Sequence, residues 1–160
     1  MLVVVMAGSF LNSCDTTELN LTENPNILTS GDVNLLLNSM QLGYRNNVST
    51  FNGLGGQLTR IDFMGGRDYF NNFPGSTMNG VWSTTYSNIF ANLQEMERIN
   101  NESDINYDFH VGLGKIMQAH SLIILVDLIG NAAYSEALDP IQFPAPNLDE
   151  GASIYTVALG

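Results

Sequence analysis

One stretch dominates the hydrophobic pattern of this chain: residues 115–138, which are apolar on nearly every side. The stretch starts with several polar positions, is continuously apolar over residues 122–126, and passes Asp127 before it ends at Gly130 and Asn131. A helix that is apolar on most of its faces must be covered by other elements on most of its faces. The pattern therefore predicts a central helix against which the rest of the chain packs.

A second helix is predicted just before this stretch. Large apolar residues recur there at intervals of 4, 3, 4 and 3, which is the spacing of one helix face. These residues are Trp82, Tyr86, Ile89, Leu93 and Met96. We expect a helix over residues 81–99, with Trp82 packed in the core rather than free to stack on a ligand.

A short polar turn joins the two predicted helices. Asn100 and Asn101 end the first helix, and Ser103 or Asp104 is expected to cap the second, which runs to Ile129. Helices joined by such a turn form an antiparallel hairpin.

The predicted helix that ends at Ile129 contains small and polar residues, and their presence requires an explanation. Gly112 and Gly114 each cost about 1 kcal/mol relative to Ala in a helix, so we expect a neighbouring helix to approach closely there. Asp127 is an acid in an apolar helix and is expected to face loop donors or Arg98. His120 is expected to be held by a hydrogen bond rather than to act as a ligand.

A further helix is predicted near the start of the chain. Ser30 is its expected N-cap, and apolar residues follow at helical spacing until Asn46 and Asn47 end it. Residues 48–80 hold many glycines and several aromatic residues, which predicts an ordered loop with a short helix or strand near residues 58–64.

Beyond the central helix, a turn and a proline-containing connection precede a last helix. Tyr134 and Glu136 are expected to lock the turn, and Asp149 is expected to cap a helix over residues 150–159. That helix is apolar and needs a partner. We therefore expect the chain to be the N-terminal part of a longer protein.

The charge balance excludes two classes of partner. The chain has 16 acidic and 5 basic residues, and its net charge is -11. Nucleic acids and anionic membrane surfaces both require a basic surface, so neither is an expected partner. The loops are rich in Asn, Gly, Ser and Thr, which either suits polar neutral ligands or reflects biased composition.

No metal, cofactor or catalytic motif is expected. Cys14 is the one cysteine, so neither an intramolecular disulfide nor a cysteine-based zinc site is available. His110 and His120 are ten residues apart and do not form an i, i+4 metal pair. The sequence has no Ser/His/Asp signature, G-x-S-x-G, H-E-x-x-H or phosphate loop.

The N-terminus has the pattern of an exported lipoprotein. Residues 2–11 are an apolar run too short to span a bilayer, and Leu-Asn-Ser precedes Cys14 as in a bacterial lipobox. No Lys or Arg precedes the run, so a buried strand with a chance cysteine is the alternative. We expect residues 1–13 to be a signal peptide, Cys14 the lipidated N-terminus and residues 14–29 a tether.

Four stretches of the chain share one resemblance. They are the run ending at Cys14, the Leu-Asn…Asn-Pro-Asn tether within residues 19–26, the helix that begins near Trp82, and the LVDLIGN…YSEAL run of residues 125–138. Together they resemble the N-terminal part of SusD/RagB-type nutrient-binding outer-membrane lipoproteins, whose pattern in the last stretch is close to LVDLFGDIPYSEAL. This chain has Asn131 where Asp is usual and Ala133 where Pro is usual.

The resemblance implies both a fold and a function. It implies an all-α fold of helix pairs of tetratricopeptide type with long irregular loops, in which residues 30–160 are the incomplete N-terminal part of the domain. It also implies a surface-exposed outer-membrane protein, anchored by lipid at Cys14. Such a protein captures oligosaccharides or other nutrients for a TonB-dependent, SusC-like transporter.

The candidate ligand site is the glycine-flanked loop of residues 62–73. Sugars are bound by aromatic faces and by the hydrogen-bonding groups of Asp, Asn and Arg. The candidate ligand residues are Asp62, Arg67, Asp68, Tyr69, Asn71 and Asn72. The alternative is a loop that an Arg67–Asp68 pair and buried aromatic residues merely hold in place.

Two other functions fit the same sequence. Asp62 and Asp68 are a candidate carboxylate pair for a secreted glycoside hydrolase. A secreted interaction protein is the third hypothesis, because Asn20, Asn47 and Asn101 each begin an Asn-x-Ser/Thr glycosylation triplet. We favour the binding protein over both, and expect no enzymatic activity.

Overall fold

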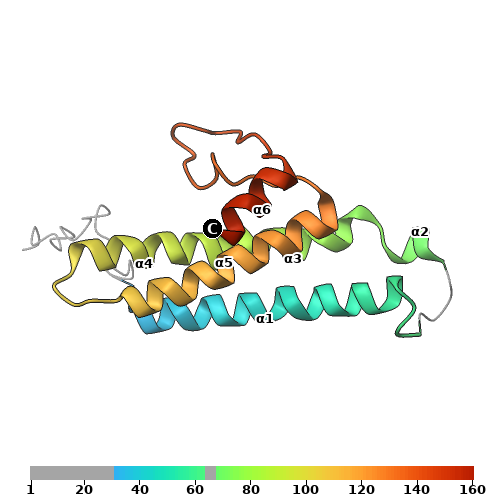
Figure 1. Cartoon of the computed structure of the whole chain (residues 1–160), viewed down its shortest axis with the longest axis horizontal. Coiled ribbons are helices and arrows are strands. Elements are labelled where there is room, and N and C mark those ends of the chain that lie inside the picture. The colour runs from blue at the N-terminus through green and yellow to red at the C-terminus, as the bar shows by residue number, and fades with distance from the viewer. Residues whose placement is uncertain (1–30, 64–67) are drawn as a thin grey trace, which may run out of the picture.

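The computed structural model describes residues 31–63 and 68–160. Within these ranges the chain forms helices joined by loops, and its only extended pairing is a single bridge between Ala132 and Asp149 (Figure 1). The elements are α1 (Val33–Leu58), α2 (Tyr69–Asn72), the 3₁₀ turn η1 (Gly75–Met78), α3 (Asn79–Thr84), the π-helical η2 (Thr85–Phe90), α4 (Ala91–Glu102), α5 (Asp108–Ile129) and α6 (Gly151–Leu159). The predicted all-α class is confirmed.

Residues 115–129 of the apolar stretch lie in α5, the central helix of the fold. It packs against α1, η2, α4 and α6, and Figure 1 shows α6 lying across α5 on the side away from α1. By length and composition alone α5 is also long and apolar enough to cross a membrane, a test that core helices of soluble proteins pass as well. Its packing against four other elements is that of a core helix, as predicted.

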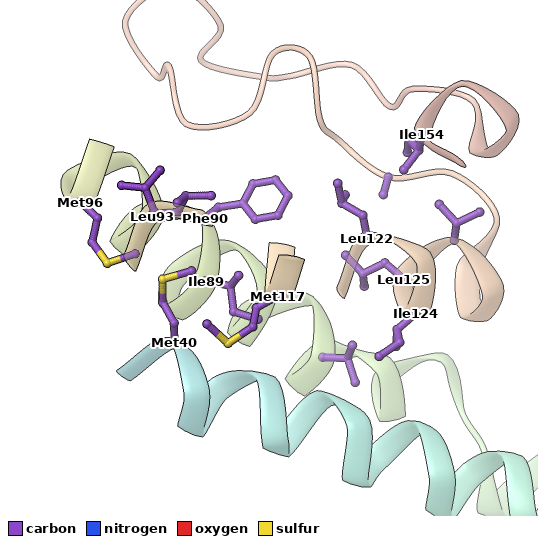
Figure 2. Close-up of a cluster of buried hydrophobic side chains, with 14 of the residues drawn as sticks. Met40, Ile89, Phe90, Leu93, Met96, Met117, Leu122, Ile124, Leu125 and Ile154 are labelled. Atoms are coloured by element: carbon purple, nitrogen blue, oxygen red, sulfur yellow. The ribbon is translucent and has the colours of Figure 1, made fainter. Parts of the chain in front are cut away.

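The core is one cluster of side chains drawn from α1, α3, η2, α4, α5 and α6, and Figure 2 shows much of it. Its fully buried members include Met40, Ile89, Met96, Leu122, Ile124, Leu125 and Ile154. Burying one such side chain contributes about 1.5–3 kcal/mol relative to leaving it exposed. Burial of this cluster, to which α5 contributes Leu122, Ile124 and Leu125, is therefore a large source of stability among the described elements.

The helix predicted over residues 81–99 is confirmed as a continuous helical run through α3, η2 and α4. The π-helical turn in η2 is wider than an α-helical turn, so it changes which residues face the core. Val81 and Thr85 are buried before Ile89, whereas Trp82 and Tyr86 are half-buried and pack against the edge of the core. Trp82 is thus a packing residue, as expected.

The predicted end of the first helix at Asn46 and Asn47 is wrong, because α1 continues to Leu58. Asn47 is only 1% exposed, and its side-chain amide donates a hydrogen bond to the Thr85 hydroxyl at 2.9 Å. A buried amide with a partner no longer competes with the helix backbone, so the helix passes through it. At the start of α1, Asp32 is the N-cap, and its side chain accepts a hydrogen bond from the backbone N–H of Asn34. Ser30 lies outside the described residues.

The predicted start of α5 at residue 103 or 104 is also wrong. The helix begins at Asp108, whose N–H donates to the Asn106 side chain at 2.9 Å. Ser103 accepts instead from the Ile105 N–H, which forms a turn in the connecting loop. Its hydroxyl therefore supports the loop rather than the helix.

The end of α5 and the turn after it follow the prediction closely. Gly130 has a φ of 89°, a conformation that L-residues rarely adopt, and it ends the helix. Glu136 accepts hydrogen bonds from the backbone and side chain of Asn147. The backbone N–H of Tyr134 donates to Asp149 at 2.8 Å. Both residues therefore hold the turn, as expected.

Asp149 does not cap α6, contrary to the prediction. Its carboxylate accepts from the N–H groups of Tyr134 and Ser135 and from the Ser135 hydroxyl, and these bonds hold its pKa below the usual range. The Asn131 side chain accepts instead from the N–H of Gly151, the first residue of α6. Asp149 thus fixes the preceding turn to the chain that enters α6.

The two glycines inside α5 have different surroundings. A Cβ on Gly114 would lie 2.8 Å from Leu93 Cδ1 and 2.9 Å from Met96 Cε, whereas a Cβ on Gly112 would meet nothing within 4 Å. The expected close contact with a neighbouring helix is confirmed at Gly114. It is wrong at Gly112.

We predict opposite effects of leucine at these two positions. Gly114→Leu should lower the free energy of unfolding by about 1–3 kcal/mol, because the new side chain has to displace Leu93 and Met96. Gly112→Leu should raise it by up to about 1 kcal/mol through helix propensity. Urea unfolding followed by circular dichroism measures both, and equal effects would contradict the packing described here.

Candidate functional site

The candidate loop begins where α1 ends. Arg60 has a φ of 62°, which turns the chain back on the helix, and the Asp62 N–H donates to the Gly56 carbonyl at 3.0 Å. The Asp62 carboxylate lies against Gly56, where a Cβ would come within 2.5 Å of its oxygen. Glycine at position 56 therefore permits this placement of Asp62, whose side chain is exposed.

The second part of the loop is α2, which Asp68 caps. The Asp68 carboxylate accepts from the Asn71 side chain at 2.6 Å and from the Asn71 N–H at 3.2 Å. The Asp68 carbonyl accepts from the Asn72 N–H at 2.9 Å. These contacts use the carboxylate as a helix cap, and the bonds from Asn71 hold its pKa below the usual range.

Both parts of the loop lie at the same end of the helical bundle, the end at which α1 finishes (Figure 1). Asp62, Asp68, Asn71 and Asn72 are all exposed there. Of the other candidates, Arg67 lies outside the described residues and Tyr69 is described by its backbone alone. This end of the bundle thus presents carboxylates and amides to solvent, which are hydrogen-bonding partners for sugar hydroxyls.

The pKa of the Asp68 carboxyl group bears on the glycoside hydrolase hypothesis. A glycoside hydrolase needs one carboxyl group with a raised pKa to protonate the leaving group. The pKa of Asp68 is shifted in the opposite direction by its Asn71 partner. Asp68 is therefore suited to accept hydrogen bonds and poorly suited to act as a general acid.

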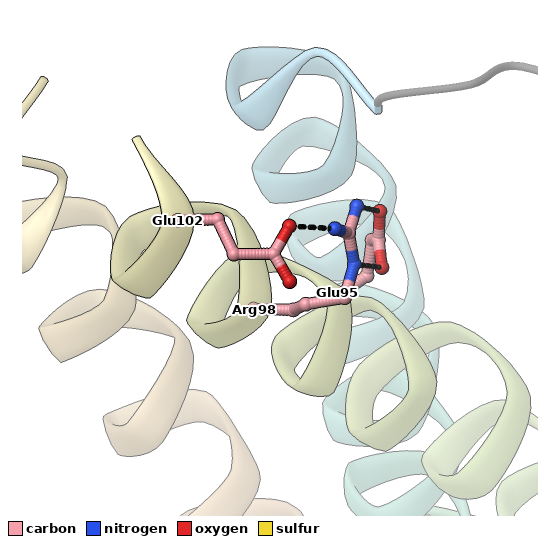
Figure 3. Close-up of polar contacts among 3 residues, drawn as sticks. All are labelled: Glu95, Arg98 and Glu102. Carbon is pink, nitrogen blue, oxygen red and sulfur yellow. Dashed lines mark hydrogen bonds and ion pairs between the residues drawn. The ribbon is translucent and has the colours of Figure 1, made fainter. Parts of the chain in front are cut away.

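Arg98 is engaged within its own helix and does not pair with Asp127, so that expectation is wrong. Its guanidinium donates to Glu95 at 2.8 and 2.6 Å and also to Glu102 (Figure 3). The bonds from Arg98 hold the pKa of Glu95 low, and Glu95 raises the pKa of Arg98. Asp127 is exposed and accepts a hydrogen bond from the Tyr155 hydroxyl of α6.

Three other residues are placed as follows. His120 contacts the Tyr44 hydroxyl at 2.7 Å, which confirms that a hydrogen bond holds it. Asn47 is buried and cannot carry a glycan in the folded chain. Its Asn-x-Ser/Thr triplet therefore gives no support to the glycosylation hypothesis. Asn101 is exposed, while Asn20 lies outside the described residues.

Among residues 31–63 and 68–160, no three His, Cys, Asp or Glu side chains are grouped so as to hold a metal ion. Cys14 and the predicted segments 1–13 and 14–29 lie outside the described residues.

A hollow lies between α4, α5 and the turn after α5. Its lining includes Gln94, Glu97, Gln118 and Tyr134. These residues come from three separate elements, so no periodicity in the sequence groups them. The only indication of this hollow in the sequence is the presence of polar amides and an aromatic residue, and many protein surfaces share that combination.

Comparison with known proteins identifies the class. A model of the SusD-like family, described as "Starch-binding associating with outer membrane", matches residues 22–160. No curated protein and no solved structure matches the chain. The chain belongs to the SusD-like family, and membership implies carbohydrate binding in association with the outer membrane.

The capping role of Asp68 makes a pH-dependent prediction. Because its pKa is lowered by folding, the cap is intact above the ordinary pKa of an aspartate and is lost as the pH falls through the lowered value. Asn71→Ala should raise the pKa of Asp68 toward its ordinary value, since the side-chain bond is the largest cause of the shift.

Carbon-detected NMR titration of the Asp68 carboxyl group measures this change. Asn72→Ala is the matched control, because Asn72 contacts Asp68 only through its backbone N–H. An Asp68 pKa that is the same in both variants and in the parent chain would show that Asn71 has no such role.

Proposed function

We propose that this chain is a lipid-anchored, surface-exposed protein of the outer membrane that captures oligosaccharides for a TonB-dependent, SusC-like transporter. The family match over residues 22–160 is the observation that carries the proposal. It is supported by an acidic surface that excludes nucleic acid and by exposed amide and carboxylate groups at one end of the bundle.

The ligand site that we propose is the loop at this end of the bundle. Its residues are Asp62, Arg67, Asp68, Tyr69, Asn71 and Asn72. Sugars expose hydroxyl groups that both donate and accept hydrogen bonds, and Asp and Asn offer complementary acceptors and donors. The ring of Tyr69 would supply the aromatic face. Because Asp68 and Asn71 already bind each other, Asp62 is the carboxylate most available to a ligand.

The proposed anchor is Cys14. In this proposal residues 1–13 are a signal peptide, residues 14–29 tether the protein to the lipid, and residues 30–160 are the first part of a larger tetratricopeptide-like domain. A single acyl chain binds membranes only marginally, so stable anchoring requires the multiply acylated cysteine of bacterial lipoproteins.

Removal of the Asp62 carboxylate should weaken sugar binding. A hydrogen bond to a charged group is worth about 1.5–3 kcal/mol, so we expect Asp62→Ala to lower the affinity of this loop for maltoheptaose by roughly 10- to 150-fold. The side-chain amide resonance of Asn71 reports binding at this loop during NMR titration.

Asp104→Ala is the control for the loss of one negative charge, because Asp104 is exposed and lies in the α4–α5 connection at the other end of the bundle. It should leave the titration unchanged. The assignment of the site to this loop fails if Asp62→Ala and the parent chain titrate alike.

Mutation of the anchor should release the protein. Cys14→Ser should shift the protein from the membrane fraction to the soluble fraction of cells that express it, because the thiol that carries the lipid is absent. Mass spectrometry of the parent protein should find an acylated Cys14 as the mature N-terminus. An intact, unacylated N-terminus would refute lipid anchoring, and a glycan on Asn101 would favour the secreted interaction protein instead.

A further inference from the structure

A groove runs along α5 between α4, α6 and the turn after α5. Two adjoining hollows form it, and both are lined by Glu97, Gln118 and Tyr134. The larger has a volume of about 530 Å³, which is within the range of small-molecule sites, roughly 300–1,000 Å³. The groove lies on the middle of the bundle, whereas α2 lies at one end (Figure 1).

Three polar groups in this groove have no hydrogen-bond partner among the described residues. The side-chain amides of Gln94 in α4 and Gln118 in α5, and the hydroxyl group of Tyr134, make no hydrogen bond with any described residue. Some other amides are engaged within the protein: Asn47, Asn71 and Asn147 all bind other residues. Unpartnered amides that converge from different elements are available to a ligand.

The remaining lining is apolar. Leu93, Leu122 and Phe90 form its floor, and the Tyr134 ring packs edge-on against Phe90 with ring centroids 6.3 Å apart. Val157 and Leu159 of α6 line the other side, 51% and 76% exposed. Apolar side chains next to amides suit a sugar ring, which has apolar C–H faces and polar edges.

The charge of the groove favours a neutral ligand. Its charged side chains, Glu97 and Lys115, form an ion pair with each other at 3.0 Å. A charged ligand would have to compete with this pair. A protein helix packed into the groove would bury the Gln94 and Gln118 amides, and unsatisfied buried amides cost about 1–3 kcal/mol each. A saccharide satisfies them with its hydroxyl groups.

We propose that this groove is a second carbohydrate-binding subsite, in which Gln94 and Gln118 bind hydroxyl groups and Tyr134 contacts a sugar ring. The class of ligand rests on the proposed function, whereas the location of the subsite does not. A chain with one site at the end of the bundle and another on its side binds two units of the same polysaccharide, which raises its overall affinity without new contacts at either site.

NMR titration of the ¹⁵N-labelled chain with maltoheptaose tests the subsite. The side-chain amide resonances of Gln94 and Gln118 should shift saturably, while that of Gln41, exposed on α1, should not. Gln118→Ala should weaken binding at the groove about tenfold, as read from the Gln94 resonance. Tyr134→Phe, which keeps the ring and the backbone bond to Asp149, should weaken it by a smaller factor.

The outcomes separate this inference from the proposed function. If the Gln94 and Gln118 resonances stay still while the Asn71 resonance shifts, the groove is no subsite and the proposed function stands. If the resonances of the two glutamines shift and that of Asn71 does not, the groove is the binding site, and the assignment of the site to the loop at the end of the bundle is wrong. If maltoheptaose moves none of these resonances, both proposals are overturned. Circular dichroism of each variant confirms that it is folded.

Discussion

The covering of α5 is the constraint on which the rest of the structure depends. This helix is apolar on most of its sides, and α1, η2, α4 and α6 cover much of it, while Phe109 and Ile116 remain 73% and 66% exposed. The absence of a side chain at Gly114 lets α4 approach closely enough for Leu93 and Met96 to reach α5. The arrangement of the described helices follows from the burial of this single element.

The same arrangement decides which surfaces are left for ligands. Because the long α1 extends to Leu58, the loop that carries Asp62 and α2 is placed at the end of the bundle, away from the core. Because α6 lies across α5, a groove remains between them and α4, lined by amides and an aromatic ring. The end of the bundle lies away from the core, whereas the groove is lined in part by the core residues Phe90, Leu93 and Leu122.

Amides take the place of cations in this acidic chain. With 16 acidic and 5 basic residues, most carboxylates cannot form ion pairs, and several accept hydrogen bonds from neutral donors instead. Asp68 binds Asn71, Asp108 binds Asn100 and Asn106, and Glu136 binds Asn147. The abundance of Asn thus has a structural use, and only some of the loop amides remain for a ligand. Such neutral bonds fix the loops without the screening by salt that weakens surface ion pairs.

The sequence by itself determined the central helix, its end at Gly130, the helix of residues 81–99 and the turn held by Tyr134 and Glu136. These features depend on periodicity and on local backbone chemistry, which a chain carries in consecutive residues. Only the tertiary structure decided that α1 passes through Asn47, since the partner of that amide is Thr85, 38 residues away. It also decided that Asp149 binds the turn rather than caps α6, and that Gln94, Gln118 and Tyr134 share a groove. Contacts between distant segments exist only after packing, so no local pattern encodes them.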